Sequence, residues 1–187
     1  MLFAKDSPDI NFVIISPEPN IGRLKGTVRS IKNNYREDAK IICSVEKGIK
    51  KPQIEEMREV CPTFRGGQTV TSLINNGMKH ALSGWNMLVV EGAWVPKNIQ
   101  YKYSRWISSS KDVLFPIVIN FDRQGVPARI LSTFGECTLN GILLDKDFFF
   151  EVGNLSENPL KISREFWAME AADKGANFKA ILGIKIC

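Results

Sequence analysis

Short apolar runs alternate with segments of helical periodicity along the first hundred residues. The apolar runs are typical of strands buried on both faces, and they lie at 12–16, 40–45 and 86–90. Segments with apolar residues at every third or fourth position predict amphipathic helices, which begin near 21, 52 and 69. Strands that alternate with helices are characteristic of a parallel sheet covered on both faces. We therefore predict a Rossmann-like α/β fold with a mixed, mainly parallel sheet.

The predicted helices also have recognisable starts and inner faces. Asn20 is a plausible N-cap for the first helix, and Pro52 opens the second at a favoured position. The loop at 65–67 precedes the third helix, over 69–82, whose expected inner face is Val70, Leu73, Ile74, Met78 and Ala81. A further helix is predicted from Pro96, with one side formed by Ile99, Tyr103 and Trp106.

The pattern changes after residue 107. Runs at 113–119 and 128–134 flank a polar, glycine-containing turn, which predicts an antiparallel hairpin. We expect a short strand at 140–144, a turn at 145–152 and a helix at 163–174 that Gly175 ends. The chain has no internal repeat or linker, so the prediction is a single domain over 1–187.

Composition narrows the function classes. The chain has 187 residues, 44% of them hydrophobic, and a net charge of +5. Its basic residues are spread out, which favours a solvated surface over a nucleic-acid interface. Four cysteines without a CxxC pair favour reduced thiols over a zinc or disulfide framework. No leader or membrane-length apolar segment is present, so we expect a soluble, cytoplasmic protein without a membrane span.

The turn after the first strand is the first candidate ligand site. Ser16, Pro17 and Asn20 lie between a buried strand and a helix N-terminus. In open α/β sheets ligands are commonly held at such a point, and a helix N-terminus favours anions such as phosphate. The turn alone is equally compatible with a simple strand-to-helix connection.

Further motifs follow this turn in a consistent order. Glu46 follows the second strand, Asn75, Asn76 and Gly77 lie within the third helix, and Glu91 follows the third strand. A glycine-containing turn at 152–157 precedes the last long helix. Over residues 12–178, this set resembles the family-2 glycosyltransferases of the type-A, nucleotide-diphospho-sugar transferase fold.

The resemblance implies a role for each part of the chain. It makes about 10–106 the nucleotide-binding half and about 107–187 the acceptor half. It implies a nucleotide-diphospho-sugar donor, an acceptor that it does not identify, and a Mn²⁺ or Mg²⁺ cofactor. The nucleotide-binding residues would be Ser16, Pro17, Asn20, Glu46, Asn76, Gly77 and Lys79. Glu91 would be the metal ligand, and Trp94 would stack on a sugar ring or base. A packed loop tryptophan is the alternative for Trp94.

Two departures weaken the predicted chemistry. The family's Asp-x-Asp metal motif is replaced by Glu91, Gly92 and Ala93, which leaves one carboxylate. Phosphate charge would then be neutralised by basic residues such as Arg23, Arg65 or Lys79.

The catalytic base is the second departure. The family's acidic pair falls on Ser163 and Arg164, and arginine cannot accept a proton. Glu165 is the next carboxylate, rotated by about 100° around the helix, and Glu157 and Asp147 are other candidates. A favourable helix N-terminal position is the alternative explanation for Glu165.

Three functions stay open on the sequence. The first is a glycosyltransferase in which a carboxylate deprotonates the acceptor hydroxyl. The second is a catalytically degenerate module that binds a nucleotide-sugar or glycan. The third is a basic module that contacts nucleic acid or protein.

Overall fold

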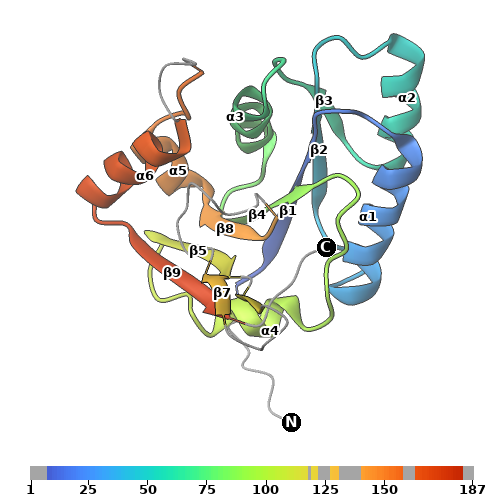
Figure 1. Cartoon of the computed structure of the whole chain (residues 1–187). Helices are drawn as coiled ribbons and strands as arrows, with labels where there is room; N and C mark the ends of the chain where they lie inside the picture. Colours follow the sequence, from blue (N-terminus) through green and yellow to red (C-terminus); the bar gives the residue numbers. More distant parts are fainter. Residues whose placement is uncertain (1–7, 118, 122–126, 131–139, 158–162, 183–187) are drawn as a thin grey trace.

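The computed structural model describes residues 8–117, 119–121, 127–130, 140–157 and 163–182 (Figure 1). Its centre is a seven-stranded sheet in the order β3-β2-β1-β4-β8-β5-β9, and β6 and β7 form a separate two-stranded sheet. The strands are β1 (Ile10–Ser16), β2 (Ile41–Val45), β3 (Thr63–Arg65), β4 (Trp85–Val90), β5 (Asp112–Ile117), β6 (Ile119–Phe121), β7 (Pro127–Ile130), β8 (Ile142–Asp145) and β9 (Asn177–Leu182). The helices are α1 (Ile21–Asn34), α2 (Lys51–Val60), α3 (Val70–His80), α4 (Ile99–Ser104), α5 (Lys146–Val152) and α6 (Ser163–Asp173).

The main sheet is mostly parallel, as the sequence pattern predicts. β1 pairs in parallel with β2 and β4, and β2 pairs in parallel with β3. β8 is antiparallel to both of its neighbours, β4 and β5, and β9 pairs in parallel with β5. The carboxyl ends of β1, β2, β3 and β4 therefore meet at one edge of the sheet, where loops lead into α1, α2, α3 and α4.

The alternating side chains of β1 divide the core into two layers. Phe12 and Ile14 pack with residues of α1, α2 and α4 on one face. Val13 and Ile15 pack with α3, α5 and α6 on the other face. The ribbon shows the same division, with α1 and α2 on one side of the sheet and α3, α5 and α6 on the other (Figure 1). Both faces of the parallel part are buried, so β1, β2 and β4 consist mainly of apolar residues.

Local chemistry explains where the helices begin. The Asn20 side chain accepts a hydrogen bond from the Arg23 amide and caps α1. Thr69 caps α3 through a reciprocal capping box with Ser72. Gly77 lets α3 approach the sheet closely, because a Cβ there would lie 2.5 Å from Cγ1 of Val13. The predicted cap of α1 is thus confirmed.

The structure corrects the sequence prediction at several elements. The predicted strand at 113–119 divides into β5, which joins the main sheet, and β6, which pairs with β7 in an antiparallel hairpin. Residues 131–134 of the predicted partner strand lie outside the described part of the chain. β3 and β9 were not predicted, and α5 occupies the segment expected to be a turn. The two strands depend on pairing with β2 and β5, which local periodicity does not encode.

Two expected buried side chains are exposed instead. Val70 is 40% exposed because it is the first residue of α3 and lies at the end of the face that packs on the sheet. Trp106 is 50% exposed because α4 ends at Ser104. The same helix begins at Ile99 rather than near Pro96, since Asn98 adopts a left-handed conformation with φ 64°.

In the residues that the structure describes, the helices lack the length and apolar character that a membrane crossing requires.

Candidate functional site

A buried carboxylate lies where β1 and β4 end. Glu91 follows β4, and its side chain is 2% exposed. The hydroxyl of Ser16, the last residue of β1, donates a hydrogen bond to Oε2 of Glu91. The Asn20 amide donates to Oε1 at 3.0 Å, and Nε of Arg23 donates to the same oxygen at 3.1 Å. The predicted residues Ser16, Asn20 and Glu91 thus form one hydrogen-bonded cluster at the start of α1.

Burial dominates the electrostatics of this cluster. It raises the pKa of Glu91 above its ordinary value of 4.5, although the Ser16 hydroxyl, the Asn20 amide and Arg23 all act in the opposite direction. The Arg23 guanidinium is half exposed and also donates from Nη2 to the Glu18 carbonyl at 2.5 Å. Arg23 therefore links Glu91 to the turn between β1 and α1.

The cluster does not fit a divalent cation as it is arranged. Both oxygens of Glu91 accept hydrogen bonds from the chain's own donors, and one faces a guanidinium. Across the described residues, no group of three His, Cys, Asp or Glu side chains is placed to hold a metal ion. The arrangement suits the Arg23 guanidinium, and metal binding by Glu91 stays a prediction.

A cavity of about 300 Å³ opens farther along the same edge of the sheet. It lies between the end of β3, one face of α3, and α5 with the turn that follows it. Its lining combines two cations, three amide side chains, an aromatic ring and a carboxylate. The lining residues are Arg65, Gly66, Gly67, Ser72, Asn75, Asn76, Lys79, Phe150, Asn154 and Glu157.

Side-chain amides from α3 fix two walls of this cavity. Asn75 donates to the Leu155 carbonyl at 2.8 Å and accepts from the Leu155 amide at 2.9 Å. This pair of hydrogen bonds attaches the turn after α5 to α3. Asn76 donates to the buried Ser44 hydroxyl at 3.0 Å. Ser44 lies on β2 opposite Ile15 of β1, so the cavity and the Glu91 cluster are neighbours along the sheet edge.

The structure places the other predicted nucleotide-binding residues at different distances from this cavity. Lys79 lines it directly, and Glu46 follows β2 with a half-buried side chain. Pro17 is exposed in the turn before α1. Gly77 faces the sheet rather than the cavity, where it permits close packing against Val13. A binding role for these residues stays a prediction.

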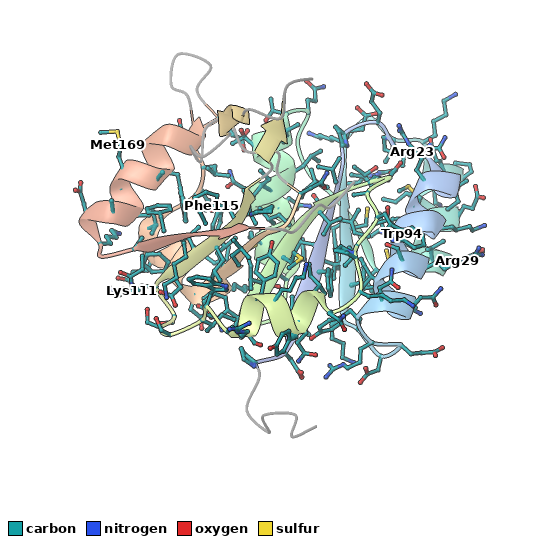
Figure 2. The ribbon with its side chains drawn as sticks, turned by 60° about the horizontal axis from the view of Figure 1, so that its bottom comes forward. Arg23, Arg29, Trp94, Lys111, Phe115 and Met169 are labelled. Carbon is teal, nitrogen blue, oxygen red and sulfur yellow. The ribbon has the colours of Figure 1, made fainter. Side chains whose placement is uncertain are left out.

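Trp94 lies apart from the cavity, in the loop that follows Glu91. Its side chain is 53% exposed, whereas its neighbours Ala93 and Val95 are buried. Figure 2 shows Trp94 on the side of the molecule formed by α1, as are Arg23 and Arg29. The structure therefore presents Trp94 to solvent, and the alternative of a packed loop tryptophan does not apply.

The predicted catalytic carboxylates have different surroundings. Glu157 is exposed and lines the cavity. Asp147 is exposed in the first turn of α5. The backbone of Glu165 belongs to α6, but its side chain lies outside the described part of the structure.

Sequence reasoning missed part of the cavity lining. Phe150 is 40% exposed although it lies in an apolar run at 148–150, and Asn154 projects from the turn after α5. Gly66 and Gly67 bring the backbone against α3, where a Cβ on Gly67 would lie 2.2 Å from Oγ of Ser72. The glycine pair before a helix cap was the available signal for close approach.

The chain is similar in structure to a known glycosyltransferase. A crystal structure of S. aureus TarS matches with a TM-score of 0.65 and 11% identity, covering 96% of this chain and 36% of that chain. A second structure, of TarS 1–349, matches with a TM-score of 0.62 and 13% identity, covering 94% of this chain and 59% of that chain. No protein-family model matches the sequence, and no characterised protein matches it significantly.

This chain therefore spans about a third of the longer TarS chain and three-fifths of the shorter one. At such identities the likeness concerns the fold. The seven-stranded, mainly parallel sheet and these two structural neighbours together show that the chain has a glycosyltransferase-like α/β fold.

Proposed function

We propose that this protein binds a nucleotide-diphospho-sugar at the carboxyl edge of its sheet and transfers the sugar to an acceptor. The observation that carries the proposal is the cavity, where the predicted residues Asn76, Lys79 and Glu157 come together with Arg65. It lies outside the carboxyl ends of parallel strands, where α/β proteins hold their ligands. The glycosyltransferase-like fold supports the same assignment.

The lining supplies the chemistry that such a donor needs. Arg65 and Lys79 offer positive charge to a diphosphate. Asn76 in the lining offers a polar group to a nucleobase, and Glu46, which follows β2 outside the lining, offers another. Phe150 adds an exposed ring within the same cavity.

In the transfer step, a carboxylate removes the proton from the acceptor hydroxyl. The acceptor oxygen then forms a bond to the anomeric carbon while the bond from that carbon to the donor's phosphate oxygen breaks. The nucleoside diphosphate leaves with the bonding electron pair, and the sugar is transferred with inversion. Glu157, which lines the cavity, and Glu165 are the proposed bases. The proposal includes no metal-dependent step, because the Glu91 cluster does not fit a divalent cation.

Two measurements test this proposal. Uridine or guanosine diphosphate at 100 times its dissociation constant is expected to stabilise the fold by about 2.7 kcal/mol. Incubation with nucleotide-sugars is expected to release nucleoside diphosphate, also in the presence of a chelator. An unchanged melting temperature across a panel of nucleoside diphosphates would contradict donor binding.

A second candidate is a module that binds the nucleotide-sugar without turnover. It is favoured by one observation, the occupation of the Glu91 carboxylate by Ser16, Asn20 and Arg23. It predicts stabilisation by nucleoside diphosphates without release from any nucleotide-sugar. Release of nucleoside diphosphate that is lost when Glu157 or Glu165 is substituted would support the transferase instead.

A further inference from the structure

The connection between β2 and α2 carries concentrated positive charge at the carboxyl edge of the sheet. Lys47, Lys50 and Lys51 lie close together in the sequence, and all three are exposed. Lys51 pairs with Glu55, and the first turn of α2 contains no acidic residue. Among the residues that the structure describes, no ion pair includes Lys47 or Lys50. Their charges are therefore available to a ligand.

Hydrogen bonds join this connection to the wall of the cavity. The Lys47 amide donates to the Gly67 carbonyl at 3.2 Å, and Nη2 of Arg65 donates to the Ile49 carbonyl at 3.1 Å. Arg65 and Gly67 both line the cavity, and Lys50 directly follows Ile49. The segments that lead into α2 and α3 leave the sheet at the same end (Figure 1). Lys47, Lys50 and Arg65 thus form one group at this end of the cavity, which we call the loop cations.

Arg65 has a defined position within this group. The Gly66 amide donates to the Val45 carbonyl at 2.8 Å, which holds the end of β3 against β2. The bond to the Ile49 carbonyl uses one of the five N–H groups of the guanidinium. In the described part of the chain, Arg65 forms no ion pair. A guanidinium oriented in this way suits a phosphate group, which accepts two parallel hydrogen bonds from it.

The charge of a bound diphosphate has to be neutralised by the chain's own cations. The resemblance to glycosyltransferases implies a divalent cation after β4, but the Glu91 cluster does not fit one, and Arg23 is paired within it. The loop cations have the opposite surroundings. The carboxylate nearest to them in sequence is that of Glu46, which is half-buried, so three positive charges face one negative charge.

We propose that the loop cations hold the diphosphate of the donor in place of a divalent cation. This inference rests on the function proposed above and adds Lys47 and Lys50 to its binding residues. It assigns the phosphate groups to the ends of β2 and β3, whereas the resemblance implies a metal-bound diphosphate at the end of β4. The rest of the donor then occupies the cavity that Arg65 and Gly67 border.

A longer polyanion fits the loop cations less well. Nucleic-acid strands are bound by charges that follow an extended backbone and by several exposed rings on which bases stack. The loop cations are confined to one loop and the adjoining strand end, beside a cavity of about 300 Å³. Their extent matches a short phosphate group. Oligothymidylate is therefore expected to bind more weakly than a nucleoside diphosphate.

The test compares ligands that differ only in their number of phosphate groups. Uridine and guanosine mono- and diphosphates are titrated onto the full chain by calorimetry in the presence of a chelator. We expect the diphosphate to bind about tenfold more tightly than the monophosphate. Combined Lys47→Gln and Lys50→Gln substitution should reduce this ratio to about twofold, because each exposed charge contributes a few-fold. Contacts with the nucleoside are common to both ligands and cancel in the ratio.

A double variant with the same change of charge is the control. Lys32 in the last turn of α1 and Lys40 just before β2 are both exposed, and they lie toward the opposite edge of the sheet. Lys32→Gln with Lys40→Gln should keep the tenfold ratio. The inference is wrong if the ratio is unchanged in the Lys47 and Lys50 variant, or if the control lowers it equally. Tighter binding of oligothymidylate than of the diphosphates would also overturn it.

Inorganic pyrophosphate separates this inference from the proposed function. If nucleoside diphosphates bind but their preference over monophosphates does not depend on Lys47 and Lys50, the inference alone is wrong. If pyrophosphate binds through these lysines while no nucleoside diphosphate binds, the loop cations are a phosphate site and the donor function is wrong. If neither ligand binds, both proposals are wrong. Binding of both ligands, each weakened in the same double variant, supports both proposals.

Discussion

The Glu91 carboxylate has three donors, and each would lose its acceptor if the side chain were removed. Ser16 and the Asn20 amide are held against it at the end of β1, and Arg23 is held by the same oxygen that the amide contacts. Buried donors without acceptors are costly. We expect Glu91→Ala to lower the free energy of unfolding by about 2–4 kcal/mol, measured by urea denaturation. A change below about 0.5 kcal/mol, typical of a surface site, would contradict this account.

The raised pKa of Glu91 also predicts a pH dependence. Below the ordinary value of 4.5 the carboxyl is protonated in both the folded and the unfolded chain, so its burial is not penalised. As the pH rises through the higher folded pKa, ionisation favours the unfolded chain and stability is lost. Glu91→Gln removes this loss, so its unfolding free energy should depend less on pH in that window. If the free energy of unfolding of both proteins depended on pH in the same way, burial would not be what determines the pKa of Glu91.

Asp112 is expected to show the opposite dependence. Burial acts to raise its pKa, but hydrogen bonds from Lys179, the Ser108 and Ser109 amides and Asn177 outweigh it and lower the pKa to about 2. The stabilisation is present above the unfolded value of 3.8 and is lost as the pH falls through the folded pKa. The difference corresponds to about 2 kcal/mol.

Asp112→Asn should abolish the part of the stability that depends on ionisation of Asp112. We expect the variant to be less stable at neutral pH and to lose less stability than the unaltered chain between pH 3.8 and about 2. Urea denaturation at a series of pH values measures both effects. Asp9→Asn, which alters an exposed ion pair with Arg36, is the control. It should leave the loss of stability at low pH as it is in the unaltered chain.

At the scale of elements, two helical glycines should respond oppositely to the same substitution. A Cβ on Gly26 of α1 would meet nothing within 4 Å, so Gly26→Ala should stabilise the fold by about 0.5–1 kcal/mol through helix propensity. A Cβ on Gly77 of α3 would lie 2.5 Å from Val13, so Gly77→Ala should destabilise it by about 1–3 kcal/mol. Thermal and urea unfolding of both variants provide the measurement. Equal effects would mean that packing against β1 does not explain Gly77.

The elements that the sequence predicted are those whose signal is local. The apolar run before Ser16 and the cap at Asn20 identify β1 and α1 without reference to the rest of the chain. β3 is three residues long and exists as a strand because it pairs with β2. β5 was assigned to a hairpin because its partners β8 and β9 lie about 30 and 60 residues farther along the chain. Non-local pairing of this kind leaves no periodicity to recognise.

At the scale of the whole molecule, the candidate site joins segments that are distant in sequence. The sequence predicted Asn76 and Lys79 from one motif and Glu157 from another, about 80 residues away, and the structure places all three around one cavity. It did not predict that Phe150 would face that cavity, because a phenylalanine in an apolar run has the signature of a core residue. Which member of such a run is exposed depends on how α5 meets α3, a tertiary contact.

Asn75 carries the connection between these distant segments. Its amide both donates to and accepts from the backbone of Leu155, 80 residues away, and so holds the turn after α5 against α3. Asn75→Ala removes both hydrogen bonds and Asn75→Asp removes the donor, so Ala should cost more stability, about 1–3 kcal/mol. The Leu155 amide should lose protection in hydrogen exchange while amides of β1 keep theirs, because the opening is local. Nucleoside diphosphate binding should weaken in parallel, since Asn154 and Glu157 of the same turn line the cavity. Asn33→Ala, an exposed change on α1, is the control; if Asn75→Ala matched it in both exchange and binding, the turn would not depend on α3 for its position.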